Sequence, residues 1–466
     1  MSNSIGLVIL SAGQGVRLKM KVPKPLAPAL GKCLVDFPIT ESFRFIEQNK
    51  LQGEISLVTG HMREDVEKYV NENYPSKPIT YAFQEKQLGT AHALRCYFEQ
   101  VSQASKFDYT AVLCADTPLI RASDLSQLYL YLQAQNLDGV AATFVDKNPK
   151  GYGRIVRGEK AFHIVEEKDA SEEIRKITEV NSGLYILKTS FILKHLNNID
   201  SKNKSGEFYL TDLFKDHFNV APLLFENPET FIGVNTLRHL EDVERILTLE
   251  KTAQLRDEGV RFLQATSCYI DWEVTIGEGS IVQPNVMMTG KCKIGKGVTI
   301  GAGSILKNAV IEDGATIKPY TVIENGIIRA EAEIGPFARI RPDSDIGPKS
   351  KIGNFVETKK VKLDKGVKVS HLSYVGDAEV GEDSNLGCGF ITCNYDGAKK
   401  HKTKIGKNCF IGSDSQMIAP IEIGDNCYVG SGSTINKSMP AGSFAIARAR
   451  QDTKEGLAQR FIKKKE

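Results

Sequence analysis

An aliphatic residue recurs at every sixth position through most of the C-terminal half of this chain. The four uninterrupted series are Ile276, Val282, Met288, Ile294, Ile300 and Leu306; Ile311, Ile317 and Ile323; Ile328, Ile334, Ile340, Ile346 and Ile352; and Ile405, Ile411, Met417, Ile423, Val429 and Ile435. An α-helix cannot use this period, because apolar side chains six residues apart drift around its axis. A solenoid of short strands can, since each hexad forms one flat wall and stacked turns bury a continuous apolar column. The period therefore predicts a solenoid of hexapeptide repeats.

The length and composition of the chain predict a soluble protein with two or more domains. Its 466 residues are too many for one ordinary core, and its net charge of +3 argues against a nucleic-acid partner. No apolar run is long enough to span a membrane, and Met1–Gly6 lacks the features of a signal peptide. Nine scattered cysteines without a Cys-x-x-Cys pair predict neither a disulfide framework nor a structural zinc site. We therefore expect a cytoplasmic protein with reduced thiols and no membrane insertion.

Residues 1–235 alternate between short apolar runs and helical stretches. The expected strands are Ile5–Leu10, Ile55–Thr59, Tyr109–Cys114 and Gly139–Phe144, and the expected helices include Met62–Tyr74 and Ser123–Ala134. This alternation predicts an α/β domain with a mostly parallel sheet, whose ligands bind at the carboxyl ends of the strands. We expect a connecting helix over residues 236–265, the hexad domain over 266–447, and a basic tail over 448–466 that includes Lys463, Lys464 and Lys465.

A glycine loop follows the first expected strand. Gly13 and Gly15 let backbone N–H groups approach a phosphate chain, and Arg17 and Lys24 add positive charge. The third glycine of a dinucleotide-binding fingerprint is missing, because position 18 is Leu, so a nicotinamide cofactor is disfavoured. Gly-x-Gly-x-Arg followed by Pro-Lys-Pro resembles the signature of sugar-phosphate nucleotidyltransferases.

Three further segments predict the base and metal sites of such an enzyme. The run from Gln84 to His92 looks like the base-reading loop of uridylyltransferases, in which amide side chains match both edges of uracil. Asp116 follows an apolar strand, and Asn235 supplies a second oxygen ligand at the end of the domain. Mg²⁺ needs few protein ligands, because phosphates and water complete its shell. For Asp116 alone a helix or turn cap would be an equal alternative, which the glycine loop makes less favourable.

Small and hydrogen-bonding residues farther along the domain predict a pocket for a polyhydroxy ligand. They are Gly153, Glu166, Asn181, Tyr209 and Thr211. Each one alone has a simpler structural explanation, so the prediction depends on the set.

Polar residues crowd the hexad region around the interval from Ile352 to Ile405, where the period is broken. They are Arg341, Lys359, His371, Tyr374, Asn385, Asn394, Tyr395 and Lys400. Interruptions on one face of a repeat protein mark its binding face. Transfer of an acyl group from a thioester to an amine fits, with His371 as the base and the cations holding a sugar phosphate. An isolated histidine would more often be a buried or capping residue, but the surrounding cations and amides favour a base.

Over nearly its whole length the chain resembles the family of bacterial bifunctional N-acetylglucosamine-1-phosphate uridylyltransferases and glucosamine-1-phosphate acetyltransferases. The segments that carry the resemblance are Gln87–Thr90, Gly151–Ile155, Ile334–Arg339, Gly353–Glu357 and Ile391–Ala398. The resemblance implies a Rossmann-like nucleotidyltransferase domain followed by a left-handed parallel β-helix. It also implies acetyl-CoA-dependent N-acetylation of glucosamine 1-phosphate, then Mg²⁺-dependent uridylyl transfer from UTP to N-acetylglucosamine 1-phosphate. The product serves peptidoglycan and lipopolysaccharide synthesis, and family members are homotrimers.

The resemblance also assigns roles to residues. Asp116 and Asn235 would bind the metal, while Arg17 and Lys24 would stabilise charge on the triphosphate. The nucleotide and sugar would contact Leu10, Ala12, Gly13, Gly15, Gln84, Gln87, Gly89, Thr90, Gly153, Glu166, Asn181, Tyr209, Thr211 and Asn235. His371 would be the general base, with Asn394 as its orienting partner. The amino sugar would contact Arg341, Lys359, Tyr374, Asn385 and Lys400, and acetyl-CoA would contact Cys388, Asn394, Tyr395, Ser413, Ser431 and Arg448.

The chain departs from the family pattern at four notable positions. Ala115 replaces the usual glycine before the metal-binding Asp, Cys388 and Phe390 replace small residues beside the acetyl site, and Ser431 replaces Ala. We expect Phe390 to narrow that site. The alternative function is a nucleotidyltransferase of single activity whose β-helix only assembles or regulates it. A non-enzymatic solenoid is a third alternative, against which the phosphate loop argues.

Overall fold

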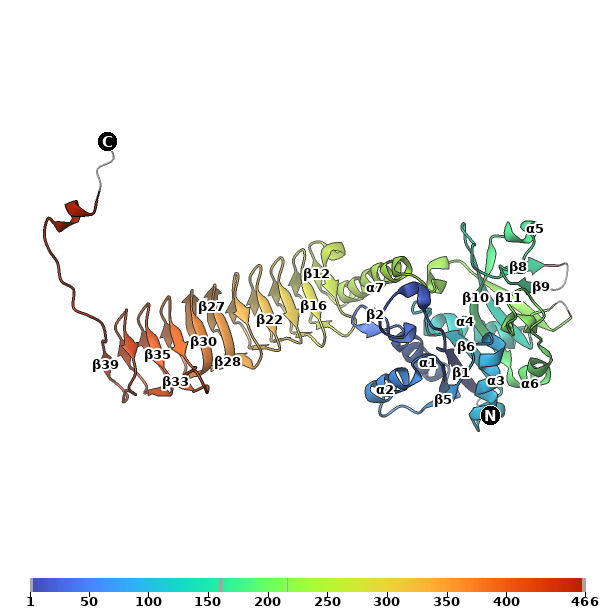
Figure 1. The fold of residues 1–466 in the computed structure, drawn as a ribbon, viewed down its shortest axis with the longest axis horizontal. Helices are drawn as coiled ribbons and strands as arrows, with labels where there is room; N and C mark the ends of the chain where they lie inside the picture. Colours follow the sequence, from blue (N-terminus) through green and yellow to red (C-terminus); the bar gives the residue numbers. More distant parts are fainter. Residues whose placement is uncertain (1–2, 159–161, 216, 463–466) are drawn as a thin grey trace. The chain divides into compact units, whose positions relative to one another are not determined.

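The computed structural model describes residues 3–158, 162–215 and 217–462, and its contacts divide the chain into two compact units that meet at residue 247/248 (Figure 1). The division falls within helix α7 (Leu237–Asp257). This helix ends earlier than residue 265, because Gly259 adopts a φ of +91° and the N–H of Val260 turns back to the carbonyl of Leu255. None of the helices in the described chain has the length and apolar character needed to cross a membrane.

The first unit is built on one sheet, which contains nine strands within the described residues, seven of them in the order β11-β7-β10-β6-β1-β4-β5. These strands are β1 (Ser4–Leu10), β4 (Gln52–Thr59), β5 (Ile79–Phe83), β6 (Tyr109–Cys114), β7 (Gly139–Val145), β10 (Glu179–Lys188) and β11 (Val220–Phe225), with β8 (Arg154–Arg157) and β9 (Phe162–Val165) attached beside β10. A small hairpin pairs β2 (Pro28–Ala29) with β3 (Lys32–Cys33). Strands β6, β1, β4 and β5 are mutually parallel, whereas β10 is antiparallel to both of its main neighbours. The predicted α/β class with a mostly parallel sheet is confirmed.

Helices cover both faces of this sheet. They are α1 (Asp36–Gln48), α2 (Arg63–Asn73), α3 (Thr90–Gln100), α4 (Ala122–Ala134), α5 (Glu172–Arg175) and α6 (Thr189–His195). Successive residues of a strand face opposite sides, so Leu7 joins a core with α1, α2 and α4, while Val8 joins a second core with α3 and α6. Because both faces are buried, the strands are continuously apolar and their polar ends gather at one edge.

The second unit is a parallel β-helix with three walls. The first wall contains β12 (Arg261–Phe262), β15 (Ile281–Val282), β18 (Thr299–Ile300), β21 (Thr316–Ile317), β24 (Glu333–Ile334), β27 (Lys351–Asn354), β29 (Lys368–His371), β31 (Asn385–Leu386), β34 (Phe410–Ile411), β37 (Tyr428–Val429) and β39 (Phe444–Ala445). The second contains β13 (Tyr269–Ile270), β16 (Met287–Thr289), β19 (Ile305–Lys307), β22 (Val322–Glu324), β25 (Arg339–Ile340), β32 (Ile391–Cys393), β35 (Gln416–Ile418) and β38 (Thr434–Ile435). The third contains β14 (Thr275–Ile276), β17 (Lys293–Ile294), β20 (Val310–Ile311), β23 (Ile327–Ile328), β26 (Ser344–Ile346), β33 (Thr403–Ile405) and β36 (Ile421–Ile423).

The hexads form the interior of this β-helix. Ile276 pairs with Ile294, so one turn contains three hexads. Every member of the four aliphatic series is buried, and together they form a single core along the unit. The sequence period thus predicted both the architecture and the identity of the core residues.

The interruption of the hexads has a structural counterpart. Strands β28 (Glu357–Leu363) and β30 (Tyr374–Val380) each run across two walls, and residues 394–402 form a loop between β32 and β33. Beyond β39 the chain carries a short 3₁₀ helix, η8 (Leu457–Arg460), and its side chains are largely exposed. Lys463, Lys464 and Lys465 of the predicted tail lie outside the described residues.

Candidate active sites

The glycine loop after β1 forms one side of a cavity of about 300 Å³ in the first unit. Seven of the predicted nucleotide-binding residues line it, together with Ala93 and Glu207: Leu10, Ala12, Gly13, Gln84, Gln87, Gly89 and Thr90. The Gln87 amide donates a hydrogen bond to the carbonyl of Ala12, and the Gln84 amide donates to the carbonyl of Gly89 at 3.0 Å. The two amides that we expected to read a base therefore lie beside the predicted phosphate loop. Ala93 and Glu207 carried no sequence signal.

Gly15 does not line this cavity, but its backbone brings the loop close to Lys24. Its φ is +63°, and a Cβ placed on it would lie 2.7 Å from the Cβ of Lys24. A side chain at this position would therefore push Lys24 away. Gly13, by contrast, faces open space.

Four predicted residues converge beside this loop, although they are far apart in sequence. The Lys24 ammonium pairs with the Asp116 carboxylate and donates to the Asn235 side-chain oxygen at 2.9 Å. The Arg17 guanidinium donates to the same Asn235 oxygen at 3.1 Å. The backbone N–H of Val234 donates to the Asp116 carbonyl at 2.8 Å, which fixes the two oxygen-bearing segments side by side. The cluster therefore contains two side chains whose oxygens could bind a metal ion, Asp116 and Asn235, and two cationic side chains, Lys24 and Arg17.

These donors fit a hard divalent cation that is bound mainly by a phosphate chain. Among the described residues, no group of three or more His, Cys, Asp or Glu side chains is placed to hold a metal ion. One carboxylate and one amide oxygen suit Mg²⁺, which keeps water and phosphate oxygens in its shell. Cys114 lies next to this cluster, and its burial, together with the nearby Asp116 charge, raises its pKa to about 12. Its thiol is therefore neutral near pH 7, and a soft thiol is in any case a poor ligand for Mg²⁺.

The predicted sugar-binding residues form a connected group. The Thr211 hydroxyl donates to the Glu166 carboxylate at 3.1 Å, and the Asn181 N–H donates to the Gly153 carbonyl at 2.9 Å. A Cβ on Gly153 would lie 3.6 Å from the Glu166 Oε1, which places these pairs together. Burial raises the pKa of Glu166 and also raises the pKa of Tyr209, and the Glu166 carboxylate adds to the second shift.

Arg154 is buried next to this group and holds two of its segments together, a role that was not predicted. Its side chain is 2% exposed, pairs with Glu167 at 2.7 Å and donates to the carbonyl of Tyr152. A buried cation tied to one carboxylate and one carbonyl holds the 151–153 loop against the 166–169 segment.

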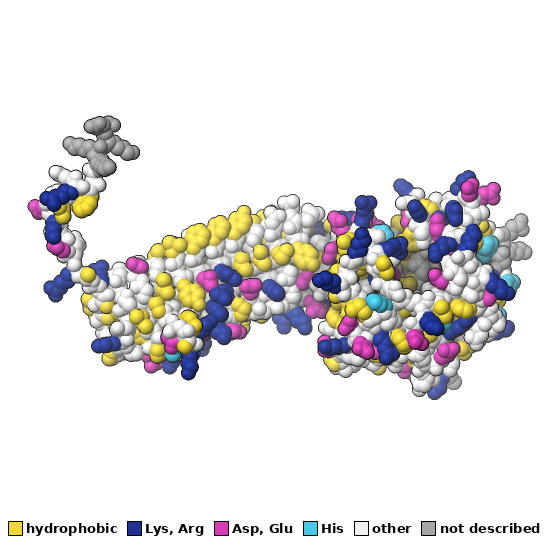
Figure 2. Space-filling model, viewed as in Figure 1, with side chains coloured by type: hydrophobic (Ala, Val, Ile, Leu, Met, Phe, Trp, Pro, Cys, Tyr) yellow, Lys and Arg dark blue, Asp and Glu magenta, His cyan; other side chains and the backbone are white. Residues whose placement is uncertain are grey.

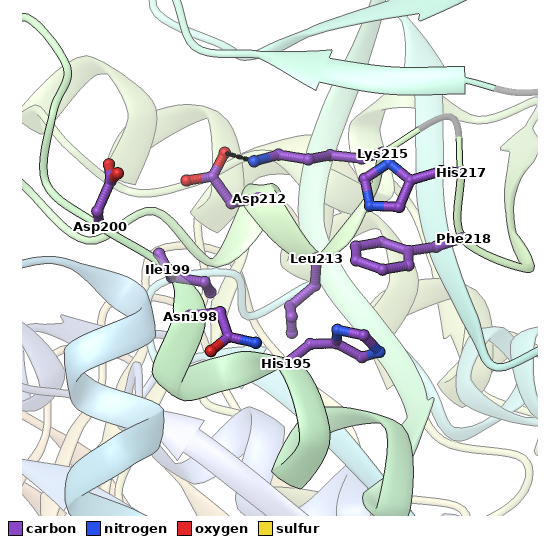
Figure 3. Close-up of a pocket in the computed structure, with 9 residues that line it drawn as sticks. All are labelled: His195, Asn198, Ile199, Asp200, Asp212, Leu213, Lys215, His217 and Phe218. Atoms are coloured by element: carbon purple, nitrogen blue, oxygen red, sulfur yellow. Dashed lines mark ion pairs between the residues drawn. The ribbon is translucent and has the colours of Figure 1, made fainter.

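A second cavity in the first unit, of about 380 Å³, is lined by none of the predicted site residues (Figure 3). Its wall includes Phe218, whose ring lies between those of His195 and His217 at centroid distances of 4.5 and 4.1 Å. Asp212 pairs with Lys215 at 3.3 Å in the same wall, and the Lys215 side chain starts beside the His217 ring. Asp212 belongs to the 3₁₀ helix η5 (Leu210–Leu213), which also carries Thr211.

In the second unit, His371 ends strand β29 and its ring is exposed. Its Nδ1 lies 2.7 Å from the side-chain oxygen of Asn354, which ends the neighbouring strand β27. Asn394, which the resemblance indicated as the partner of His371, instead donates to Asp377 at 2.5 Å. Both contacts join residues 17 positions apart, because stacked turns place such residues next to each other.

Three of the predicted cations gather near this histidine's turn. Contact with Lys400 and the charges of Arg341 and Lys360 lower the pKa of Lys359. Arg341 also pairs with Glu357 at 2.7 Å. Glu357 stands opposite Tyr374 in the ladder, whereas Asn385 stands on the first wall opposite Lys368. Like charges at such close range favour an anionic ligand. Asn354, Glu357 and Asp377 carried no predicted role.

Four of the predicted acetyl-CoA residues, Cys388, Ser413, Ser431 and Arg448, follow one corner of the β-helix on stacked turns. Backbone hydrogen bonds link His371 to Gly389, Cys388 to Asp414, and Ser413 to Gly432. A Cβ on Gly432, next to Ser431, would lie 3.7 Å from the Arg448 side chain. Tyr395 lies in the 394–402 loop and is 60% exposed. The expectation for Phe390 was wrong, because its side chain is fully buried in the column and cannot narrow the site.

Comparisons with known proteins agree with the two-unit division. The nucleotidyl transferase family model matches residues 7–226, and the bacterial transferase hexapeptide model of six repeats matches residues 273–308 and 402–437. A relative from Anaeromyxobacter sp. (strain Fw109-5), named bifunctional protein GlmU, is 42% identical over 460 residues, covering 98% of this chain and 93% of the relative. Proteins of the same name from Pelobacter propionicus and Caldicellulosiruptor saccharolyticus are 37% and 39% identical, covering 99% of this chain and 99% and 98% of theirs.

Proposed function

This chain belongs to the family of bifunctional GlmU proteins, and from that premise we propose that it catalyses two transfer reactions in the synthesis of UDP-N-acetylglucosamine. The second unit acetylates the amine of glucosamine 1-phosphate with acetyl-CoA. The first unit then transfers a uridylyl group from UTP to N-acetylglucosamine 1-phosphate and releases pyrophosphate. The observation that carries the proposal is that each unit contains its own convergent cluster of reactive and ligand-binding side chains.

In the first unit, Gln84 and Gln87 hold the uracil, while the loop through Gly13 lies along the triphosphate. Arg17 and Lys24 neutralise charge on the phosphates as the sugar phosphate oxygen attacks the α-phosphorus. Catalysis of this kind depends mainly on positioning and on charge neutralisation. Asp116 and Asn235 would hold Mg²⁺, which supplies a further positive charge to the phosphate oxygens. Glu166, Asn181, Tyr209, Thr211 and Gly153 form the sugar pocket.

In the second unit, Arg341, Lys359 and Lys400 hold the phosphate of glucosamine 1-phosphate, with Tyr374 and Asn385 completing the sugar site. The amine attacks the thioester carbonyl, and the Nε2 of His371 takes the proton that the amine loses. The C–S bond then breaks, and the imidazolium returns the proton to the leaving sulfur, so CoA departs as the thiol and His371 is neutral again. Acetyl-CoA extends along the corner of Cys388, Ser413, Ser431 and Arg448 on stacked turns, and Asn394 and Tyr395 contact it from the 394–402 loop.

We further propose that the chain forms a homotrimer through its β-helix and that it is located in the cytoplasm. Tyr320, Phe337 and Phe355 stack on one corner with centroid distances of 5.2 and 5.6 Å, and all three are about half exposed. Figure 2 shows further apolar side chains running along the β-helix. Contiguous exposed apolar side chains such as these are typical of protein–protein interfaces. All nine cysteines are unpaired, as expected in a reducing compartment. Sedimentation of the purified chain at three monomer masses is the expected result, and a monomer would contradict it.

The test of function follows both products in one preparation. With glucosamine 1-phosphate and acetyl-CoA we expect release of free CoA thiol; with N-acetylglucosamine 1-phosphate, UTP and Mg²⁺ we expect release of pyrophosphate. His371→Ala should lower the first rate by about 10²- to 10⁴-fold, the usual contribution of a general base, and leave the second unchanged. Pyrophosphate release without any thiol release would leave only the alternative of a single-activity nucleotidyltransferase with a non-catalytic β-helix.

A further inference from the structure

We propose that Asn354 is the positioning residue that holds His371 in the one tautomer able to accept a proton from the amino sugar. The inference rests on the proposed acetyl transfer and names a residue to which neither the sequence motifs nor the comparisons assign a role. It begins from the contact between the His371 Nδ1 and the Asn354 Oδ1 at 2.7 Å.

The backbone fixes this contact from both sides. Asn354 and His371 are paired in the parallel ladder at the ends of β27 and β29. The N–H of Leu372 donates to the Asn354 carbonyl at 3.1 Å. The His371 carbonyl in turn accepts from the N–H of Gly389 at 3.4 Å, so the backbone of the residue is held from both neighbouring turns. Both side chains thus leave the same corner of the β-helix, one turn apart.

The amide oxygen of Asn354 then determines which nitrogen of the His371 ring carries the proton. This oxygen can only accept a hydrogen bond, so the Nδ1 of a neutral imidazole must carry the proton. The Nε2 is left with its lone pair, which is the form a general base needs. A ring without such a partner would divide its population between two tautomers, and one of them cannot accept a proton at Nε2.

The choice of an amide over a carboxylate has a second consequence. A carboxylate would also fix the tautomer, but its charge would stabilise the imidazolium and raise the pKa of His371. More of the base would then be protonated and inactive near neutral pH. The neutral amide orients the ring without this penalty, which suits a general base that must be unprotonated near neutral pH.

Two variants separate positioning from mere packing. Asn354→Leu has nearly the same size but cannot accept a hydrogen bond. We expect its kcat for thiol release to fall about 10- to 100-fold, as for other residues that orient a histidine. Its KM for glucosamine 1-phosphate should change less than about twofold. Asn354→Asp accepts the same bond and should recover most of the rate at alkaline pH. Its rising limb in the pH profile of kcat/KM should move up by about one pH unit, because a neighbouring carboxylate raises the histidine pKa.

Pyrophosphate release by the first unit is the internal control, and both variants should retain it. An unchanged kcat in Asn354→Leu, or an unchanged pH midpoint in Asn354→Asp, would overturn the proposal. Imidazole ¹⁵N shifts of histidine-labelled full-length protein give a reading that does not depend on activity, and they should show His371 protonated at Nδ1. A wild-type protein with the Nδ1–H tautomer but no thiol release would overturn the proposed function and leave the contact intact, whereas an Nε2–H tautomer would overturn the positioning role itself.

Discussion

The two candidate sites are assembled in opposite ways. In the first unit, Lys24 reaches Asp116 and Asn235, which lie 92 and 211 positions away in sequence. In the second unit, the contacts between Arg341 and Glu357 and between His371 and Asn354 span 16 and 17 positions, about one turn of the β-helix. The first site therefore depends on the topology of a whole sheet, whereas the second depends on the stacking of neighbouring turns. The four predictions that follow test this difference, from the largest expected effect to the smallest.

Asp116→Asn should separate the two activities most sharply. It removes the carboxylate charge that Lys24 contacts and that would bind Mg²⁺. We expect pyrophosphate release to fall by about 10³-fold or more, since loss of one strong electrostatic contribution in a phosphoryl-transfer site has this order of effect. Thiol release should stay within about twofold of wild type, as measured in the same preparation. Parallel loss of both rates would contradict the existence of two separate sites.

Ile334→Ala should destabilise the β-helix alone. This side chain is fully buried between Ile317 and Ile352 in the column, and truncation of such a residue costs about 2–5 kcal/mol. Chemical denaturation monitored separately by the two activities should show earlier loss of thiol release only. The control is Glu333→Ala, one residue earlier on the outer face, where loss of the surface pair with Lys318 should cost about 1 kcal/mol or less. Equal destabilisation of both units would show that the units do not unfold independently.

Lys24→Met should strengthen divalent-cation binding in the absence of nucleotide. The Lys24 ammonium already neutralises Asp116 and contacts Asn235, so a metal must displace it. We expect the Kd for Mn²⁺ to fall about tenfold. The corresponding gain in binding free energy is a small part of the electrostatic attraction between a cation and a partly buried carboxylate. Calorimetry without UTP measures this change, and the exposed Lys21→Met is the matched control. Weaker binding in Lys24→Met would show that the lysine does not occupy the position of the metal.

Glu166→Gln should give the smallest effect and one that depends on pH. Burial raises the pKa of Glu166 in the folded state above its value in the unfolded chain. Ionisation of Glu166 therefore costs more in the folded protein, and the free energy of unfolding falls as rising pH ionises this carboxyl group. Removing the charge should raise the melting temperature of the first unit by about 2 °C at pH 7, and the difference should shrink toward pH 4. KM for N-acetylglucosamine 1-phosphate should rise, because Thr211 and the sugar lose a charged acceptor. A lower melting temperature at pH 7 would contradict the assigned cost of burial.

The sequence was informative where the chemistry is local or periodic. The hexads predicted the buried column, including Ile334 and Ile352, and the glycine loop predicted the cavity that Gly13 lines. The sequence was less informative where a side chain's direction matters. Phe390 was expected at the acetyl site but points into the column. The partner of His371 was expected to be Asn394, whereas the stacking of turns brings Asn354 to it. The cavity around Phe218 carried no motif at all.

The amino-acid sequence alone predicted the two-unit plan, the β-helix and the residue types of both candidate sites, because a period of six and a glycine-rich phosphate loop each allow few backbone solutions. Only the tertiary structure decided which of those residues touch. The contact of Lys24 with Asn235 follows from the order of strands in a sheet, and the contact of His371 with Asn354 follows from the length of one turn. Neither distance is encoded in the neighbouring residues, since each is set by how distant backbone segments hydrogen-bond to one another.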